Sequence, residues 1–205
     1  MAQGLDPSDD QLVLLSKDGK LDAFNSLVER HERAVYNLAY RLLGERGIAE
    51  DATQEAFLSA FRAIGRFEGG NVRSWLLRIA ANECKDELRR RQRRGTSSLE
   101  AISEARETPF DLPDLSPGAP EVMEQHEFGA AFQQLLLQLP YDQRQAILLV
   151  DVYEYRYEEV AELTGDSLGT VKSRIHRGRE KLRVMLTARP ELFGAVGRLE
   201  GEKES

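Results

Sequence analysis

The stretch that most constrains the fold is residues 157–183, which read YEEVAELTGDSLGTVKSRIHRGREKLR. Its first part, 158–164, is a short amphipathic segment, and Gly165 and Asp166 then interrupt the helical pattern, as a turn between two crossing helices does. Ser167 is a suitable N-cap for a second helix, because its hydroxyl can accept a hydrogen bond from an otherwise unpaired backbone N–H. The stretch therefore predicts a helix-turn-helix.

The second helix of this stretch is expected to have two contrasting sides. Apolar residues recur at spacings of three, four and seven positions and build one stripe. This stripe consists of Leu168, Val171, Ile175 and Leu182. The remaining surface carries the residues that we expect to contact DNA, namely Thr170, Lys172, Ser173, Arg174, His176 and Arg177. Such a surface can enter a major groove, where Arg and Ser reach base edges and outer cations meet phosphates. The alternative is a solvated basic helix on an ordinary helical domain.

The distribution of charge favours nucleic-acid binding, although the net charge of the 205 residues is −7. Residues 85–94 hold six cations against two acids, and residues 170–183 hold six cations against one acid. Residues 96–125, by contrast, hold seven acids and a single cation. Two basic patches separated by an acidic segment are more informative than the total, because binding to DNA depends on local charge.

The composition excludes several other classes of protein. Hydrophobic residues make up 41% and charged residues 31%, which is typical of a soluble globular chain. The N-terminus is acidic and polar, unlike a secretory signal, and no apolar run approaches the roughly 20 residues that a bilayer requires. Cys84 is the only cysteine, which excludes an internal disulfide and a multi-cysteine zinc site. We therefore expect a cytoplasmic protein without membrane insertion.

The sequence predicts neither an enzyme nor a cofactor or metal site. It contains no P-loop, no paired metal-ligand motif and no Ser/His/Asp or Cys/His cluster with a mechanical rationale. Cys84 lies inside an amphipathic helical pattern, where a packed thiol is more common than a nucleophile. His31 has no second ligand in view, so we expect it at the edge of a core.

The N-terminal half predicts a long amphipathic helix over residues 20–43 and a second helix over residues 48–64. The inward side of the second helix is expected to comprise Ala52, Phe57, Ala60, Phe61 and Ile64. Its outer side carries Asp51, Gln54, Glu55 and Leu58. A row of this kind is ordinarily a solvated acidic face. A row of carboxylates and amides can, however, also pair with arginines on a partner helix.

A loop over residues 66–73 is expected before a third helix, which starts at Ser74 and continues into the first basic patch. Cations that follow a strand, next to a pocket for an unstacked base, are typical of single-strand binding. Trp75 continues the apolar stripe of this helix. We therefore expect Trp75 in the core rather than as a stacking platform.

The helical pattern breaks over residues 95–120, which contain four of the seven prolines among Ser, Gly and acids. We expect a flexible linker here, with at most short helical pieces. A second domain begins near Glu121, with helices over residues 124–139 and 143–152 before the helix-turn-helix. Pro140 lies at the start of the second of these helices, a position that proline tolerates.

Three segments resemble the extracytoplasmic-function (ECF) group of bacterial RNA polymerase sigma factors. TVKSRIHRGREKLR is similar to the DNA-reading end of region four, IAEDATQEAFLSAFR to region 2.2, and WLLRIAANECKDELRRR to regions 2.3 and 2.4. The segments follow the order of that family over about residues 10–187. Gly178 departs from the pattern, because many relatives carry alanine there, and we expect this glycine to loosen the recognition helix.

The resemblance implies three sets of contact residues. Region 2.2 would grip core RNA polymerase through Asp51, Gln54, Glu55 and Leu58. Regions 2.3 and 2.4 would open and hold the minus-ten element of promoter DNA through Phe67, Asn71, Asn82, Lys85, Arg89 and Arg90. Region four would read the minus-thirty-five element through Thr170, Lys172, Ser173, Arg174, His176 and Arg177. The resemblance also implies control by a separate anti-sigma protein.

The predicted fold is all-α, with two small helical domains joined by a flexible, acidic, Pro-rich linker. By resemblance, residues 10–94 form sigma region 2, residues 95–120 the linker and residues 121–187 sigma region 4. The alternative is a stand-alone helix-turn-helix regulator that senses a ligand through its N-terminal domain. That alternative predicts DNA binding without polymerase, and it does not account for the acidic outer row or the second basic patch.

Overall fold

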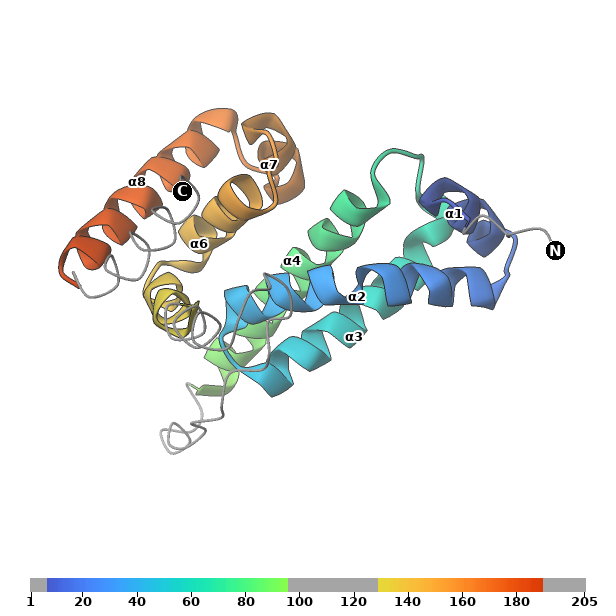
Figure 1. The fold of residues 1–205 in the computed structure, drawn as a ribbon, viewed down its shortest axis with the longest axis horizontal. Helices are drawn as coiled ribbons and strands as arrows, with labels where there is room; N and C mark the ends of the chain where they lie inside the picture. Colours follow the sequence, from blue (N-terminus) through green and yellow to red (C-terminus); the bar gives the residue numbers. More distant parts are fainter. Residues whose placement is uncertain (1–6, 96–128, 190–205) are drawn as a thin grey trace, which may run out of the picture. The chain divides into compact units, whose positions relative to one another are not determined.

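The structure, a computed structural model, describes residues 7–95 and 129–189. Within these ranges the regular elements are all helical. The chain divides into two compact units, Met1–Thr96 and Ser97–Ser205 (Figure 1). The prediction of an all-α protein with two helical domains is therefore confirmed, while the predicted linker lies almost wholly outside the described residues.

The first unit is a bundle built from long helices. Its elements are α1 (Asp9–Lys17), α2 (Leu21–Leu43), α3 (Arg46–Ala63), the 3-10 turn η1 (Ile64–Arg66) and α4 (Val72–Gly95). α2, α3 and α4 contact one another, and α1 packs against α2 and η1 (Figure 1). The first two long helices agree with the helices predicted over residues 20–43 and 48–64. α4 begins at Val72 rather than at the predicted Ser74.

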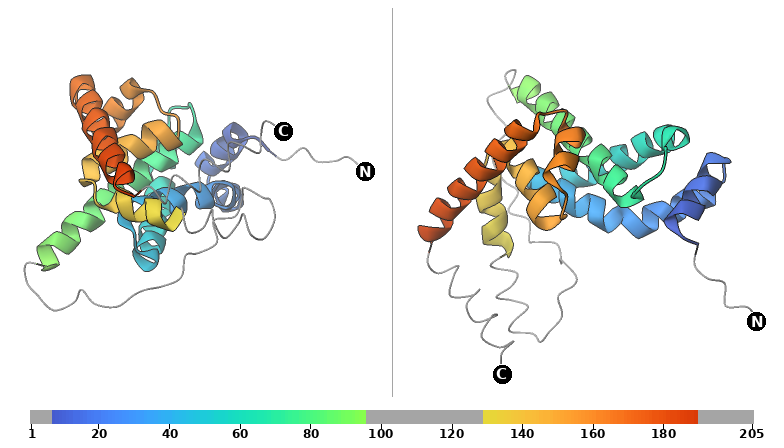
Figure 2. Two further views of the ribbon diagram at one scale, coloured as in Figure 1. Left: turned by 60° about the vertical axis from the view of Figure 1, so that its left-hand side comes forward. Right: turned by 90° about the horizontal axis from the view of Figure 1, so that it is seen from above.

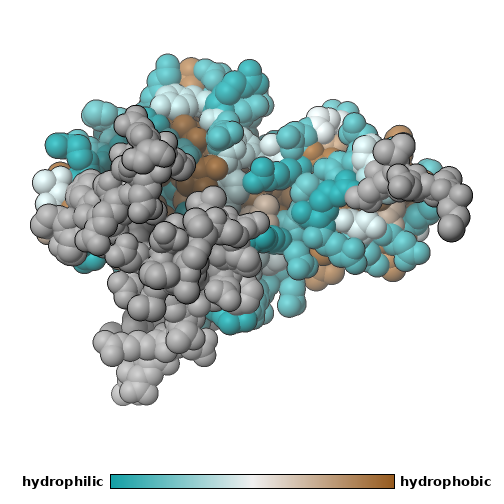
Figure 3. All heavy atoms as spheres, in the orientation of Figure 1, coloured by the Kyte–Doolittle hydropathy of each residue, from teal (hydrophilic) through white to brown (hydrophobic). Residues whose placement is uncertain are grey.

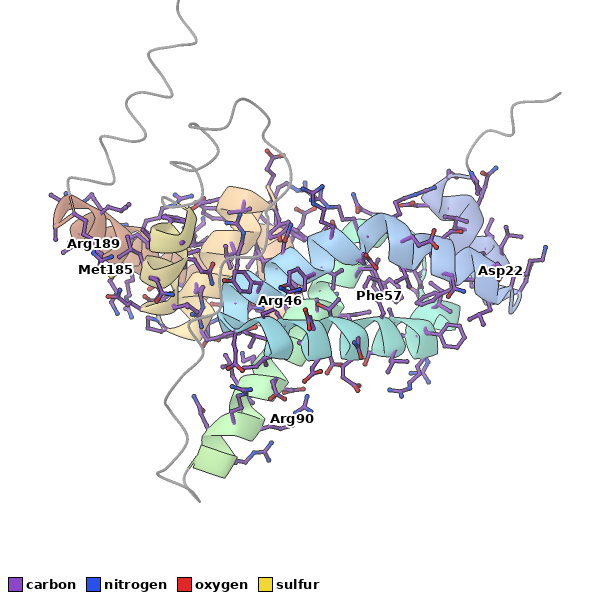
Figure 4. The ribbon with its side chains drawn as sticks, turned by 60° about the horizontal axis from the view of Figure 1, so that its bottom comes forward. Asp22, Arg46, Phe57, Arg90, Met185 and Arg189 are labelled. Carbon is purple, nitrogen blue, oxygen red and sulfur yellow. The ribbon has the colours of Figure 1, made fainter. Side chains whose placement is uncertain are left out.

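The core of the first unit lies between its three long helices. Phe57 of α3 lies between α2 and α3 (Figure 4) and is 8% exposed. The stripe that α3 buries is otherwise made largely of small residues, namely Ala49, Ala52, Ala56 and Ala60. The fully buried large side chains of this unit are Leu27, Val35, Leu38, Leu42 and Leu77. Each contributes about 1.5–3 kcal/mol by its removal from water.

Phe61 differs from the prediction that it faces inward. It is 46% exposed, and its ring meets the ring of Phe24 edge-on, with 5.0 Å between the centroids. An α-helix turns by about 100° per residue, so Phe61 lies about 40° beyond the buried Phe57, toward the outer side of α3. The apolar pattern therefore identifies the buried stripe of α3 but misplaces the residue at its border.

α1 is a helix that the sequence patterns above do not predict. Ser8 Oγ accepts a hydrogen bond from the Gln11 N–H at 3.3 Å, and the Gln11 side chain accepts one from the Ser8 N–H at 2.9 Å. This reciprocal capping box is the sequence signal that could have identified the helix. Asp9 fastens α1 to α2, because its carboxylate lies 2.6 Å from Arg30 Nη1 and 2.8 Å from His31 Nε2. His31 is 7% exposed and lies at the edge of the core, as predicted.

The second unit contains the helix-turn-helix. A helical segment over residues 129–137 is followed by α6 (Tyr141–Ile147), the π-helix η2 (Leu148–Val152), α7 (Tyr157–Thr164) and α8 (Leu168–Thr187). α8 packs against both α6 and α7 (Figure 2). Pro140 is the N-cap residue of α6, at the helix start where it was expected. Of the helix predicted over residues 124–139, the part over 124–128 lies outside the described residues.

The described residues on the face drawn in Figure 3 are mainly hydrophilic. On this face, apolar residues form separate small patches among hydrophilic ones. In the described ranges, the exposed large apolar residues are Leu14, Leu21, Leu58, Phe61, Val152 and Val184. No helix in this part of the chain is long and apolar enough to cross a lipid bilayer.

Candidate functional site

The helix-turn-helix has the local geometry that its sequence predicts. α7 ends at Gly165, whose φ of 71° lies in the left-handed region that favours glycine. The backbone N–H of Asp166 donates to the carbonyl of Ala161 at 3.1 Å. Ser167 is the N-cap of α8, and its Oγ accepts a hydrogen bond from the Thr170 N–H at 3.1 Å. Hydrogen bonds therefore fix both ends of the turn.

α8 has a buried stripe and an exposed side. The stripe consists of Val171, Ile175, Gly178 and Leu182, and the predicted member Leu168 is only half-buried. Of the residues expected to contact DNA, the exposed ones are Lys172, His176 and Arg177, and the half-buried ones are Thr170, Ser173 and Arg174. The side chains of Lys172, Arg177 and Lys181 form no hydrogen bond or ion pair with any residue in 7–95 or 129–189. These three cations are available to phosphate groups.

Arg174 differs from the other cations that were expected to contact DNA. Its guanidinium pairs with the carboxylate of Asp166 in the turn, and its Nη2 lies 3.3 Å from Asp142 Oδ2 in the first turn of α6. The Arg174 side chain is 23% exposed. Arg174 was expected to contact the minus-thirty-five element, and the structure places its guanidinium between elements of its own domain.

A second ion pair fastens α8 to η2. Arg179 Nε donates to Asp151 Oδ2 at 3.1 Å, and Arg179 Nη2 pairs with the other carboxylate oxygen. The hydrogen bonds to Asp151 raise the pKa of Arg179 above its usual value, although burial acts in the opposite direction. Arg179 is thus a second cation of α8 that is engaged within its own domain, and the sequence patterns did not single it out.

Gly178 lies where α8 packs against α6. A Cβ atom built on this buried glycine would be 2.5 Å from Ile147 Cδ1 and 3.3 Å from Ile147 Cγ1. Ile147 is itself 4% exposed, so its side chain has little room to move. The lack of a side chain at Gly178 therefore permits close contact between the two helices, in addition to its expected effect on helix propensity.

The outer side of α3 presents its predicted row to solvent. The residues of this row, here called the α3 row, are Asp51, Gln54, Glu55 and Leu58, and all are exposed. A hollow between α3 and α4 is lined by Asp51, Ala52, Gln54, Glu55, Glu87 and Arg90. Figure 4 shows Arg90 on the part of α4 that projects beyond α3. The carboxylates of the α3 row can accept charge-assisted hydrogen bonds from arginines of a partner.

The loop before α4 is held at several points. Asn71 Oδ1 accepts a hydrogen bond from the Ser74 N–H at 2.9 Å and so caps α4. The Nζ group of Lys17 in α1 donates a hydrogen bond to the carbonyl of Phe67. Phe67 is 7% exposed, and its ring lies 5.0 Å from the ring of Trp75. Phe67 is thus a core residue that packs against Trp75, and its expected place beside an extruded base stays a prediction.

Both asparagines of the predicted minus-ten site are exposed. Asn71 and Asn82 lie on the same side of α4, about 16 Å apart along the helix axis. Further along α4, Lys85 is half-buried, while Arg89 and Arg90 are exposed and pair at 3.4 Å with acids of the same helix. Such exposed pairs contribute little to stability, so a phosphate could replace the acids. A strand that runs along α4 could meet all five residues.

Sequence models of two families match the chain. The Sigma-70 region 2 model matches residues 27–94, and the model of Sigma-70, region 4 matches residues 129–182. The first match includes the α3 row and both asparagines, and the second includes α7, the turn and α8 as far as Leu182. Each match falls in one of the two units.

Two relatives of this chain are ECF RNA polymerase sigma factors. The chain is 37% identical over 180 residues to the ECF RNA polymerase sigma factor SigM of Mycobacterium tuberculosis, covering 87% of this chain and 85% of the relative. It is 39% identical over 163 residues to the ECF RNA polymerase sigma factor SigE of Mycolicibacterium smegmatis, covering 80% of this chain and 61% of that longer protein.

The fold matches that of the sigma factor RpoE of Bartonella quintana, whose structure was solved in complex with the anti-sigma factor NepR. The TM-score is 0.64, with 28% sequence identity, and the match covers 81% of this chain and 98% of the other. Sequence, fold and the order of the two matched regions therefore agree. The chain belongs to the ECF family of RNA polymerase sigma factors.

Proposed function

We propose that this protein binds core RNA polymerase, directs it to a specific set of promoters and helps to open the DNA there. The observation that carries the proposal is the presence of two different exposed surfaces: the acidic α3 row in the first unit and the unpaired cations of α8 in the second. Each surface lies within the range that the corresponding sigma region matches. A stand-alone DNA-binding regulator has no use for the α3 row.

The first unit would carry out two steps. We assign the binding of core polymerase to the α3 row, namely Asp51, Gln54, Glu55 and Leu58. We assign recognition and melting of the minus-ten element to Asn71, Asn82, Lys85, Arg89 and Arg90, with Phe67 supporting the loop from the core. An asparagine amide can both donate to and accept from the edge of an unstacked base. Because Asn71 Oδ1 caps α4, the amide NH₂ group of Asn71 is the part that would meet DNA.

The second unit would read the minus-thirty-five element. The contact residues on the exposed side of α8 are Thr170, Lys172, Ser173, His176 and Arg177. In the major groove, an arginine can make a bidentate contact to guanine and a serine can bond to several bases. Lys181, which also has no partner in the described ranges, would meet a phosphate on the flank.

The proposed boundaries are residues 10–94 for region 2, residues 95–120 for the linker and residues 121–187 for region 4. Because the related RpoE was solved with an anti-sigma factor, we propose that a separate anti-sigma protein also controls this chain. The protein would act in the cytoplasm, where polymerase and chromosomal DNA are found. It would act as an initiation factor that has no catalytic site of its own.

Run-off transcription on a library of genomic fragments tests the proposal. Purified core polymerase is assayed with and without the full-length chain, and the transcripts are sequenced. We expect transcripts that appear only with the chain and that start downstream of a shared pair of promoter elements. If the chain binds fragments but yields no transcript with core polymerase, the proposal is wrong and a stand-alone regulator is favoured.

A further inference from the structure

We propose that Arg174 is a positioning residue for DNA reading: it fixes the orientation of α8 through Asp166 and Asp142 and does not itself contact DNA. The inference rests on the proposed function, because α8 is the helix that would read the minus-thirty-five element. Because Arg174 lies on a basic helix, it would otherwise be interpreted as a contact to phosphate.

The contacts of Arg174 join three elements of the domain. Its Nη1 pairs with Asp166 in the turn after α7, and its Nη2 lies 3.3 Å from Asp142 Oδ2 in α6. A guanidinium can serve both carboxylates, because it is planar and carries several N–H donors in a fixed arrangement. The side chains of Arg174 and Asp166 are 23% and 22% exposed. Water therefore screens this pair less than it screens a surface ion pair.

A second clamp on α8 lies on the other border of its buried stripe. Arg174 and Arg179 occupy opposite borders of that stripe, because five residues advance a helix by about 500°. Arg174 pairs with Asp142 at the start of α6, and Arg179 pairs with Asp151 in η2, which continues α6. Gly178 provides the close packing between these clamps. Two ion pairs around one packed contact restrict both the tilt and the rotation of α8.

The cations of α8 consequently fall into separate groups. Arg174 and Arg179 are engaged by acids of neighbouring elements, and Arg183 pairs with Glu180 on α8 itself. Lys172, Arg177 and Lys181 have no partner in the parts of the chain that the structure describes. Each cation that neutralises a phosphate contributes about 0.9 to the slope of log K against log salt concentration. We expect Arg174 to contribute nothing to that slope.

Neutralising Asp166 separates the positioning role from a phosphate contact, because the two roles predict opposite changes in affinity. If Arg174 contacted a phosphate, Asp166→Asn would release Arg174 and remove a negative charge near the DNA, so the affinity would rise. If Arg174 positions α8, the same substitution releases the turn from the helix. The affinity would then fall by about tenfold, the size expected when a partly desolvated charge loses its hydrogen-bonded partner.

The experiment uses the full-length chain bound to core polymerase and a duplex that carries the promoter found by run-off transcription. Fluorescence anisotropy over a series of salt concentrations gives the affinity and the salt slope. We expect Asp166→Asn and Arg174→Gln each to weaken binding by about tenfold without a change in slope, and the double variant to be no weaker than either. Lys172→Ala should instead lower the slope by about 0.9.

Control variants distinguish orientation from general charge and from loss of folding. Glu158→Gln removes one exposed carboxylate from α7 of the same domain and should leave the affinity equal or slightly higher. Arg174→Lys keeps the charge without the planar guanidinium and should recover part of the loss seen in Arg174→Gln. If Asp166→Asn does not fold, as circular dichroism would show, Asp142→Asn weakens the 3.3 Å contact with Arg174 and gives a second comparison.

The outcomes for the two proposals are separate. If the wild-type complex does not select the promoter duplex over an unrelated duplex, the proposed reading by α8 fails. If it does, and a folded Asp166→Asn or Asp142→Asn variant binds as well as the wild type or more tightly, only the positioning role is overturned. A drop of about one in the salt slope for Arg174→Gln would also overturn it, because that drop identifies a phosphate contact.

Discussion

At the scale of single residues, Gly178 is subject to two opposing contributions to stability. Alanine is the better helix former by about 1 kcal/mol, but its methyl group would lie 2.5 Å from Ile147 Cδ1. We expect Gly178→Ala to lower the free energy of unfolding by about 1–3 kcal/mol, the usual cost of overpacking a core. Denaturant unfolding followed by circular dichroism measures this change.

Ile147→Val provides the matched control for this prediction. It removes the Cδ1 atom that an alanine at position 178 would meet. The double variant Gly178→Ala/Ile147→Val should therefore lose less free energy of unfolding than the two single variants lose in sum. This difference is a favourable coupling between neighbouring residues. Strict additivity would show that the two positions do not compete for the same space.

Arg177 is an exposed cation of α8 with no partner in the described ranges. We expect Arg177→Ala to weaken promoter binding by about 1–3 kcal/mol and to relax the preference at one base pair, as the loss of a bidentate contact to guanine does. Selection from a pool with a randomised minus-thirty-five element, with wild-type and variant holoenzyme, measures that preference. A uniform loss on all sequences, with a flatter salt dependence, would indicate a phosphate contact instead.

The sequence predicts which residues of α8 are basic but not what each of them contacts. Lys172 and Arg174 are both cations, and they are the two neighbours of Ser173 in the sequence. Their roles differ because folding brings Asp142, 32 positions earlier in the chain, next to Arg174. Helical periodicity gives the side of the helix, whereas the identity of a partner depends on how the helices pack.

At the scale of elements, the attachment of α1 depends on the charge of Asp9. Burial raises the pKa of Asp9, but hydrogen bonds from Arg30 and His31 outweigh this effect and hold the pKa below its usual value of 3.8. A carboxyl group with a lowered pKa stabilises the folded state above the unfolded pKa. That contribution is lost as the pH falls through the folded pKa.

We therefore expect Asp9→Asn to lower the thermal unfolding midpoint at neutral pH but to match the wild type at pH values well below 3.8. The comparison requires unfolding curves of both proteins over a series of pH values. Asp10→Asn is the control, because Asp10 is exposed and has no partner in the described residues. A constant difference between Asp9→Asn and wild type at every pH would contradict the prediction.

The α3 row is expected to bind polymerase through its carboxylates. Reversing the charge in Asp51→Lys/Glu55→Lys should weaken the binding of core polymerase by at least about tenfold, since like charges would face the partner's arginines. Both residues are exposed, so the helical content should not change. Glu32→Lys, at an exposed position of α2, is the matched control. Unchanged affinity of the double variant for core polymerase would remove the α3 row from the interface.

The elements that the sequence predicts well are those with local signals. The helix-turn-helix follows from Gly165 and Ser167, which act through their own backbone geometry and through hydrogen bonds to residues nearby in sequence. α1 carries a capping box at Ser8 and Gln11, but the helix is too short for its apolar residues to show a clear helical periodicity. The burial of Phe67 is not local, because it depends on Trp75 and on the support of the loop by α1.

At the scale of the whole molecule, the proposed function assigns a surface for polymerase and surfaces for DNA to the two units. We expect a separate anti-sigma protein to cover these surfaces under non-inducing conditions, as the family membership suggests. Affinity purification of the tagged chain from its native host, with and without stress, tests this expectation. A stoichiometric partner should co-purify before stress and be replaced by core polymerase afterwards. Recovery only as free chain or holoenzyme under every condition would indicate control by synthesis.

The π-helix η2 limits how the length of the second unit can vary in evolution. The Tyr153 N–H donates to the Leu148 carbonyl, five residues back, at 3.0 Å. Deleting one codon from η2 would restore ordinary α-helical hydrogen bonding and rotate the chain on one side of it by about 100°. Asp151 would then turn away from Arg179. Homologous genes that keep this ion pair should therefore place their insertions and deletions outside η2.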